Sequence, residues 1–405
     1  MATRSIVPRA DGEGSLGTQE KQWGDVQAKK LNGENVTTIT EIAKLIKITA
    51  DFERSYTPIA AKGVSTGTRN VLVVPAMTVN IDGVVYILAN GLELDADATD
   101  GWDSAAYAVK ANRAGKDFYI YACAPESGTT PDFILSANST VPTGYTAASS
   151  RKIGGFHCEC VAVGTIANHP LSGWAAGDIL PASVWDLKHR PVGEPEGYAY
   201  DEGTDMWYSV YGLTWTGSFG SAAATMAGRA ADDTLKLESK YGAEWADGTS
   251  SEKWHCWKFE QILARQKQRL LYHREFVAAS LGSNQGTNIY GSEDPVTTGG
   301  HKDTSNRRMI SNIGLEDCCG DHWQWGADVG RTEGETNWVD AFDGNDKYAT
   351  GQMLFGEVKR VRLGGAWDHG AVCGSRCSAW DPGALTLSAH CGARGASEPL
   401  YKRAI

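Results

Sequence analysis

The sequence lacks any apolar run long enough to cross a bilayer, and its first eight residues, MATRSIVP, lack the apolar core of a signal peptide. It also lacks a cluster of lysine and arginine that could neutralise phosphates, and its formal net charge is −11. No His-Glu-x-x-His zinc motif is present. We therefore expect a chain made in the cytoplasm that neither inserts into membranes nor binds nucleic acid.

Glycine and the large aromatic residues are abundant instead. The 405 residues include 47 glycines, 14 tryptophans and 15 tyrosines, and the glycine share is well above the average of roughly 7%. This composition favours many turns between short strands. The length exceeds what one hydrophobic core usually supports, so we expect more than one domain.

The cysteine count does not indicate a disulfide framework. Nine is an odd number, so at least one cysteine is unpaired unless it bridges two chains. Cys318 and Cys319 are adjacent, and Cys373 and Cys377 lie four residues apart. In a reducing compartment such residues are usually small buried hydrophobes. A bridge between Cys373 and Cys377 stays open.

Changes of pattern along the chain predict three parts. Residues 1–50 combine a glycine-rich turn at 11–17 with β-branched residues at 36–39 and have little core of their own. Residues 51–190 contain strand patterns, including two arms around Asp82-Gly83 that predict a two-residue hairpin turn. The economical architecture for this part is a β-sandwich.

Residues 191–405 mix helices with irregular segments rich in tryptophan. Phe259, Ile262 and Leu263 follow helical spacing, and so do Tyr272, Phe276 and Ala279. These two sets predict two amphipathic helices. The whole chain is therefore expected to be mainly β, with an α+β C-terminal domain.

Several segments of this last part fit one family pattern. They are residues 267–276 (KQRLLYHREF), 312–317 (NIGLED) with 323–325 (WQW), and 362–367 (RLGGAW) with 392–395 (GARG). Together they resemble the C-type-lectin-like domain shared by formylglycine-generating enzymes and the variable proteins of diversity-generating retroelements. Within that group the chain is most similar to the phage major tropism determinant family, because residues 142–146, 151–157 and 185–191 resemble its middle β-sandwich.

The resemblance implies a fold and a function. Residues 1–50 would form a small N-terminal trimeric β module of a tail fibre, residues 51–190 a β-sandwich, and residues 191–405 a C-type-lectin-like variable domain. The chain would be a homotrimeric receptor-binding protein at the tip of a virion's tail fibre. Its partners would be a bacterial surface protein or glycan and, through the N-terminal module, other tail proteins. It would need no cofactor and would not be an enzyme.

The same resemblance implies which positions bind. The family's diversified positions fall here on Ala366, Asp368, His369, Gly370, Val372, Ala379, Asp381, Pro382, Thr386, Ser388, His390 and Cys391. Trp367, Arg376 and Trp380 would be the fixed scaffold, with Trp380 buried. Thr386, Ser388 and His390 alternate with apolar residues, which places them on one face of a strand.

Other functions are weighed against this one. A copper oxidase of the formylglycine-generating type would use Cys373 and Cys377, but their offset after Gly364-Gly365 departs from that branch. A bacterial or prophage-encoded lectin-like protein is the other alternative. The run His157-Cys158-Glu159-Cys160 lacks a second ligand pair at zinc spacing, so we expect no metal there. The sequence does not identify the receptor.

Overall fold

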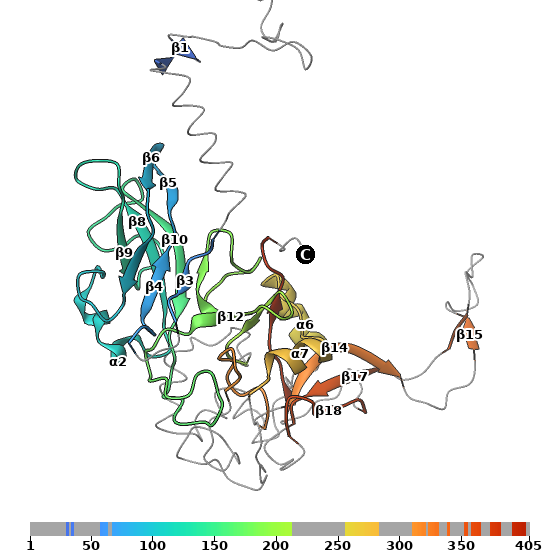
Figure 1. Cartoon of the computed structure of the whole chain (residues 1–405). Helices are drawn as coiled ribbons and strands as arrows, with labels where there is room; N and C mark the ends of the chain where they lie inside the picture. The colour runs from blue at the N-terminus through green and yellow to red at the C-terminus, as the bar shows by residue number, and fades with distance from the viewer. Residues whose placement is uncertain are drawn as a thin grey trace, which may run out of the picture. The chain divides into compact units, whose positions relative to one another are not determined.

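The structure is a computed structural model of the whole chain (Figure 1). It describes residues 57–63, 67–212, 256–282, 310–320, 323–331, 358–365, 373–381 and 391–401, together with strand segments at 30–31, 34–35, 338–340 and 352–354. The chain divides into two compact units, Met1–Thr57 and Pro58–Ile405. The boundaries expected near residues 50 and 190 stay predictions.

The N-terminal unit is described only where two short strands pair. Strands β1 (Lys30–Leu31) and β2 (Glu34–Asn35) are antiparallel. The predicted turn at 11–17 and the predicted strand at 36–39 lie outside the described residues. The trimeric nature of this module is therefore still a prediction.

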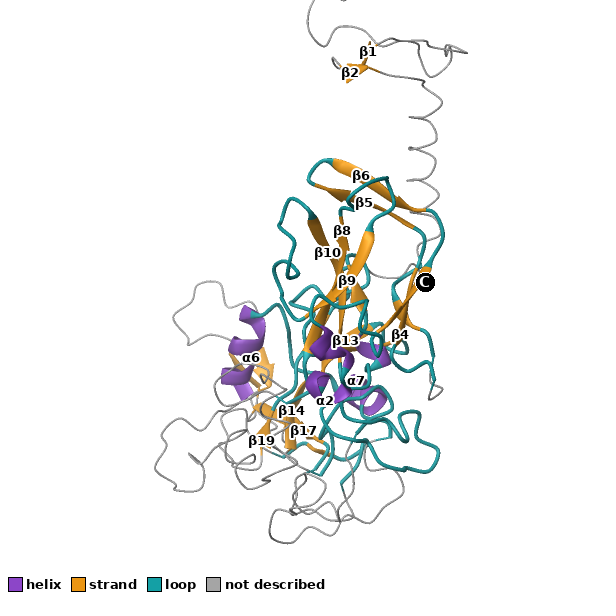
Figure 2. Cartoon of the chain, turned by 90° about the vertical axis from the view of Figure 1, so that its left-hand side faces the viewer, coloured by secondary structure: helices purple, strands orange, loops and turns teal. Residues whose placement is uncertain are grey.

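The next part of the chain is built of short strands with little helix. Its elements are β3 (Ala60–Ala61), β4 (Val71–Val74), β5 (Met77–Ile81), β6 (Val84–Leu88), β7 (Leu92–Asp95), η1 (Ala105–Ala108), α2 (Lys110–Arg113), β8 (Asp117–Cys123), β9 (Asp132–Ser136), β10 (Ser150–His157), η2 (Pro181–Ser183) and β11 (Trp185–Asp186). One sheet has the order β11-β10-β8-β9 and another β3-β4-β7. Figure 2 shows β10, β8 and β9 side by side.

The hairpin predicted at Asp82-Gly83 is confirmed. Strands β5 and β6 pair in antiparallel register up to Ile81 and Val84. Asp82 and Gly83 both have positive φ angles, 49° and 85°, as a type I′ turn requires. The arms are long enough for ladder pairing, and the turn residues tolerate the left-handed conformation. The local sequence therefore sets this element.

The two sheets share one hydrophobic core. Leu72 and Val74 from β4 pack in the same buried cluster as Phe118, Ile120 and Phe156 from β8 and β10. Burial on facing sheets is the arrangement of a sandwich.

A glycine in β10 permits a very close approach within this part. A Cβ atom on Gly155 would lie 2.5 Å from the Phe118 carbonyl oxygen and 2.7 Å from the Trp185 ring. Only a residue without a side chain fits, because real Cβ atoms do not approach other atoms so closely. The sequence pair Gly154-Gly155 thus has a packing role.

The C-terminal part combines strands with two helices. Its elements are β12 (Tyr198–Asp201), β13 (Met206–Ser209), α6 (Cys256–Arg265), α7 (His273–Ala279), β14 (Trp323–Arg331), β15 (Trp338–Asp340), β16 (Gln352–Leu354), β17 (Val358–Leu363), β18 (Ser378–Ala379), β19 (Cys391–Gly392) and β20 (Ala396–Ser397). Two sheets have the orders β12-β13-β20 and β18-β17-β14-β19. The expectation of a mainly β chain with helices in the last part is confirmed.

Both predicted helices form, with one difference. In α6, Phe259 and Leu263 are buried and Ile262 packs against them. In α7, Phe276 and Ala279 are buried, but Tyr272 precedes the helix as its N-cap and is 40% exposed. The prediction that Tyr272 belongs to the buried face is wrong, because helical spacing cannot show where a helix begins.

Arg394 joins elements that are far apart in the sequence. Its guanidinium is 1% exposed and donates hydrogen bonds to the side chain of Gln324 and to the carbonyl oxygens of Ser209, Val210 and Glu316. These hydrogen bonds pair buried acceptors with donors, and a buried acceptor that lacks a donor costs free energy. A single side chain thus fixes β13, β14 and the last strands in one arrangement.

Candidate functional site

The candidate site lies on the sheet formed by β18, β17, β14 and β19, drawn in orange and red in Figure 1. Strand β18 is an edge strand, and it pairs antiparallel with β17 through Arg362 opposite Ala379 and Leu363 opposite Ser378. Val361 and Leu363 are fully buried on one face of β17. Because side chains alternate along a strand, Arg362 projects from the other face.

Two nominated positions lie at this edge. Ala379 is half-buried within β18, and Asp381 is exposed two residues later. The Asp381 carboxylate accepts a hydrogen bond from the Arg362 guanidinium at 3.3 Å, and its side chain is 78% exposed. An ion pair with so exposed a carboxylate contributes little stability, so the Asp381 carboxylate is available to a partner.

Cys391 does not belong with them. Its side chain is fully buried because β19 pairs in parallel with β14, placing Cys391 opposite Trp323. The expectation that Cys391 faces outward as a binding position is wrong. The other nominated positions lie outside the described residues: Ala366, Asp368, His369, Gly370, Val372, Pro382, Thr386, Ser388 and His390.

The expected scaffold also differs from the structure. Trp380 is 43% exposed and Arg376 is exposed, so neither is a buried framework residue. Trp367 lies outside the described residues. The buried aromatic residues of this sheet are instead Trp323 and Trp325, 4% and 1% exposed. The prediction that Trp380 is buried is wrong. Whether a strand residue is buried depends on which other segments of the chain pack against it, and the local sequence does not show this.

Trp380 is held in a fixed orientation at the surface. Its indole nitrogen donates a hydrogen bond to the Ser378 hydroxyl at 3.1 Å, and its ring meets His273 edge to face with 6.1 Å between centroids. The ring also packs over Gly330, where an added Cβ would lie 3.3 Å from it. An ordered, exposed tryptophan is a common anchor in protein interfaces.

Arg362 is a site residue that the sequence analysis did not nominate. Its guanidinium stacks over the Trp323 ring at 5.3 Å and reaches Asp381. The signal was present, since a charged residue between the apolar Val361 and Leu363 is the pattern of a strand with one outward face. His273 is also new, because only the fold brings α7 beside β18.

The Gly364-Gly365 pair ends β17 and sets the turn next to the site. Both residues have positive φ angles, 90° and 82°, which favour glycine. Added Cβ atoms would also lie 2.3 Å from the Cys318 carbonyl oxygen and 2.5 Å from the Cys373 sulfur. The turn therefore needs glycine for its conformation and for its close packing.

The cysteines of this region pack as hydrophobic residues. No disulfide joins any of the nine cysteines, all of which lie in the described part. Burial raises the pKa of the Cys377 thiol, which disfavours the thiolate needed for nucleophilic or metal-binding chemistry. Cys373 is buried beside Gly365. This environment differs from that of an activated cysteine pair.

Within the described residues, one cluster has donor atoms close enough to bind a metal ion. Glu159, Cys160 and Glu316 are buried, and their donor atoms lie within 4.8 Å of one another. The Cys160 thiol donates to a Glu316 carboxylate oxygen at 3.6 Å. A thiol that donates its proton is neutral, whereas a metal ligand is deprotonated. We therefore assign the cluster a packing role.

The chain combines a C-type-lectin-like fold with further β-sheet parts, and this fold defines the class of protein. Comparisons with solved structures identify proteins that share it. Solved M1 and P3c variants of the Major Tropism Determinant superpose with a TM-score of 0.58 each at 22% identity. The match to the M1 variant covers 82% of this chain and 82% of the solved chain. The match to the P3c variant covers 84% of this chain and 85% of the solved chain. The chain has the fold of these proteins.

Sequence comparisons agree. Residues 76–186 match the family described as the Mtd second domain. The tail fiber receptor-binding protein of Bordetella phage BPP-1 is 29% identical over 301 residues, 73% of this chain and 74% of that protein. The resemblance predicted from the sequence is confirmed.

Proposed function

We propose that this chain is the receptor-binding protein of a bacteriophage tail fibre, a tropism determinant that recognises a bacterial surface protein or glycan. The observation that carries the proposal is the edge at β18, where Ala379 packs against the buried Trp323 and Trp325 while Trp380 and Asp381 are exposed. A rigid interior below accessible side chains lets those side chains change without unfolding the sheet. The name of the Bordetella phage relative supports the same role.

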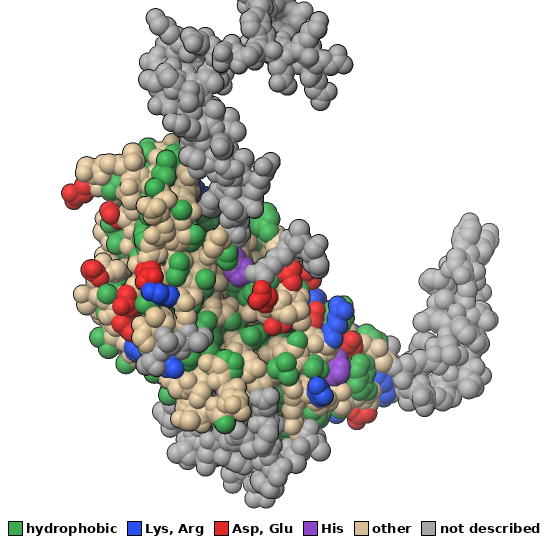
Figure 3. Space-filling view, in the orientation of Figure 1, with side chains coloured by type: hydrophobic (Ala, Val, Ile, Leu, Met, Phe, Trp, Pro, Cys, Tyr) green, Lys and Arg blue, Asp and Glu red, His purple; other side chains and the backbone are tan. Residues whose placement is uncertain are grey.

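The electrostatics of the surface suit a protein or glycan partner better than a nucleic acid. On the face drawn in Figure 3, lysine and arginine side chains are interspersed with aspartate and glutamate. Binding to nucleic acid usually needs a continuous basic surface. In the described part of the chain, no helix has the length and apolarity of a membrane span.

The protein acts by binding rather than by catalysis. Of the two cysteines that an oxidase would use, Cys373 is buried, and burial raises the pKa of the Cys377 thiol. The nominated positions carry small or polar side chains. The relatives identified here have names that describe receptor binding or tropism. The positions nominated from the resemblance other than Cys391, including those outside the described residues, form the proposed receptor-binding surface.

We further propose a homotrimer in the virion, attached to other tail proteins through residues 1–50. Strand β6 supports self-association, because Val84, Val85 and Ile87 are 53%, 40% and 37% exposed. Apolar side chains on an edge strand are commonly covered by another chain. Several weak sites on one trimer would also strengthen attachment through avidity.

Sedimentation equilibrium tests the trimer. The purified chain of 43.5 kDa is expected to sediment as three copies, and replacing Val84 and Ile87 with threonine is expected to shift the equilibrium towards monomer. Replacing Leu187 with threonine is the control, since it is also an exposed apolar residue. A purely monomeric wild-type chain would contradict the proposal.

Competition for phage adsorption tests the receptor-binding role. The purified chain is expected to block adsorption of the phage that carries it, and changing His369, Asp381 and His390 together to alanine is expected to raise the concentration needed by about tenfold or more. The thermal midpoint should change little, because exposed substitutions usually cost within about 0.5 kcal/mol.

The control for this experiment is a double change at two exposed residues far in sequence from these positions, Asp100→Ala with Glu126→Ala. It should block adsorption as the wild type does. If the triple variant also blocks as well as the wild type, the proposed surface is wrong. If the triple variant unfolds at a much lower temperature, those positions are structural.

A further inference from the structure

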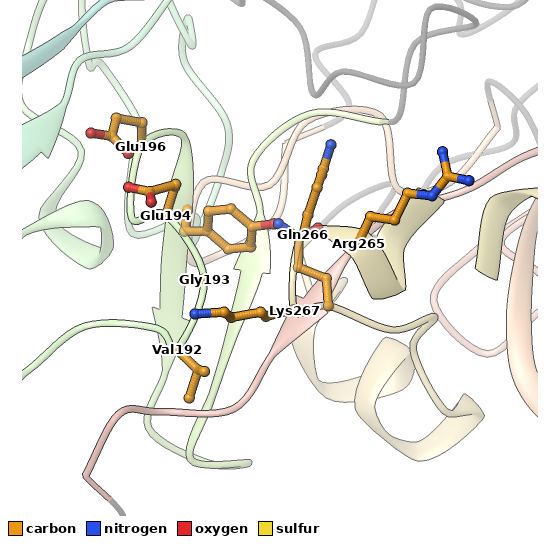
Figure 4. A pocket seen from close by; sticks show the side chains of 9 residues that line it. Val192, Gly193, Glu194, Glu196, Arg265, Gln266 and Lys267 are labelled. Carbon is orange, nitrogen blue, oxygen red and sulfur yellow. The ribbon is translucent and has the colours of Figure 1, made fainter. Parts of the chain in front are cut away.

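A pocket and a loop lie apart from the site on β17 and β18. The pocket, of about 430 Å³, lies between residues 192–198 and 265–268, and Figure 4 shows Glu194 and Glu196 on the same side of it. The Tyr119 hydroxyl already donates a hydrogen bond to Glu196, and two carboxylates alone do not define a ligand, so we assign the pocket no role. The loop joins β6 to β7, and its chemistry does not depend on the proposed function.

This loop contains an asparagine followed by a glycine. The sequence has that pair twice, at 32–33 and 90–91, and the second pair lies in the described part of the chain. Asn90 and Gly91 are both exposed, between the end of β6 at Leu88 and the start of β7 at Leu92. Glycine has no Cβ to cover its own backbone nitrogen, and its backbone adopts conformations that other residues avoid. The Gly91 nitrogen is therefore able to reach the side-chain amide of Asn90.

Neither of these two groups is held by a hydrogen bond to another described residue. The Asn90 amide has no partner among them, and the Gly91 N–H donates to none of their acceptors. Strand β7 is an edge strand of the sheet β3-β4-β7, so no other described strand pairs with the outer side of its backbone. A backbone N–H inside a sheet would first have to break a hydrogen bond before it could react. Gly91 has no such barrier from the described residues.

Asn80, in the neighbouring strand β5, provides the contrast. It is also exposed, but its side-chain oxygen accepts a hydrogen bond from the Gly83 N–H at 3.0 Å. The residue that follows it, Ile81, is β-branched and pairs with Val84 inside the hairpin, so its side chain is stiff and crowds the backbone. Exposure alone therefore does not distinguish the two asparagines. The free amide and the following glycine do.

From these features we propose that Asn90 is a site of spontaneous covalent modification, at which its side-chain amide is converted to a carboxylate. The Gly91 nitrogen loses its proton to hydroxide and attacks the side-chain carbonyl carbon of Asn90. The new carbon–nitrogen bond closes a succinimide ring, and the side-chain nitrogen takes up a proton and leaves as ammonia. A water molecule then opens the ring at either carbonyl, which gives aspartate or isoaspartate. No oxidant or reductant takes part.

The modification changes both the charge and the backbone of the loop. Either product adds a negative charge at an exposed position, and isoaspartate also adds a carbon atom to the main chain just before Gly91. Gly91 lies close to β4, since an added Cβ would be 3.0 Å from the Val74 carbonyl oxygen. The isoaspartate form therefore alters a close backbone contact, whereas the aspartate form alters only the charge.

Peptide mapping of the full chain tests the proposal. The folded protein is incubated at mildly acidic and at mildly alkaline pH and then digested with trypsin. Tandem mass spectrometry is applied to the peptide 70–110, which contains both Asn80 and Asn90. Asn90 is expected to lose ammonia at least about tenfold faster than Asn80, which corresponds to about 1.4 kcal/mol in the activation free energy. The rate should rise with pH, because the attacking nitrogen must first lose a proton.

Two controls separate the contribution of the fold from that of the sequence. The chain unfolded in guanidinium chloride gives the reactivity of the sequence alone. Asn90 in the folded chain is expected to react within about threefold of that rate, a difference of less than about 1 kcal/mol, because no described residue holds either reacting group. Asn90→Gln should abolish the modification in this peptide, since the longer side chain closes a larger ring more slowly.

The proposal is overturned if Asn90 reacts no faster than Asn80, or if folding slows its reaction by about tenfold or more. It is also overturned if aspartate forms without isoaspartate, since direct hydrolysis of the side chain would then replace the cyclic route. Receptor recognition at β18 would be unaffected by any of these outcomes, because phage adsorption measures it separately.

Discussion

Replacing Arg394 with alanine is expected to destabilise the C-terminal part by about 3 kcal/mol or more. The change removes the guanidinium donor from the Gln324 amide oxygen and from the carbonyl oxygens of Ser209, Val210 and Glu316, and a buried acceptor left unpaired costs about 1–3 kcal/mol. The Val210 carbonyl keeps the backbone N–H of Glu316 as a donor. The measurement is the urea midpoint followed by tryptophan fluorescence, because Trp323 and Trp325 are buried in the same part.

Arg394→Lys separates charge from geometry. Lysine keeps the positive charge but not the planar fork of donors that reaches four acceptors, so it should restore only a minority of the lost stability. Arg376→Ala is the control, because Arg376 is exposed and its removal should change the free energy of unfolding within about 0.5 kcal/mol. Equal effects at Arg394 and Arg376 would refute the structural role given to Arg394.

Replacing Trp380 with alanine is expected to weaken receptor binding by at least about tenfold, which corresponds to about 1.4 kcal/mol. The ring is 43% exposed and held by Ser378 and His273, so a partner gains a large contact at small entropic cost. The thermal midpoint should fall only slightly, since the ring already contacts solvent in the free protein. Competition for phage adsorption measures the first effect and calorimetry the second.

Two further variants make the Trp380 experiment specific. Trp380→Phe keeps an aromatic ring and should retain most of the binding, although it loses the hydrogen bond to Ser378. Leu187→Ala removes another exposed apolar side chain, 42% exposed, and should leave adsorption unchanged. A Trp380→Ala variant that unfolds easily yet still binds when folded would restore the earlier view of Trp380 as scaffold.

Comparing expectation with structure shows which features local sequence determines. The Asp82-Gly83 hairpin and helix α6 were predicted correctly because turn chemistry and side-chain periodicity act between near neighbours. The Gly364-Gly365 turn was recognised as part of a pattern, and its physical reason is a positive φ at both residues. Such features need no knowledge of the rest of the chain.

The candidate site was predicted only in part, because exposure is decided by distant residues. Cys391 is buried by the parallel pairing of β19 with Trp323, 68 positions earlier. Trp380 is partly exposed, and one side of its ring packs over Gly330 on β14. Neither contact leaves a trace in the local pattern around residues 380 and 391.

The sequence by itself determined that the chain is rich in short strands, where its hairpin and helices form, and which family it resembles. Only the tertiary structure decided that Arg394 rather than Trp380 secures the interior, that Arg362 contacts Asp381 and that His273 contacts Trp380. The reason is that hydrogen-bond satisfaction and burial are properties of groups brought together from separate parts of the chain. The conformational propensity of a segment depends on residues a few positions apart, so it carries no information about burial or hydrogen-bond satisfaction.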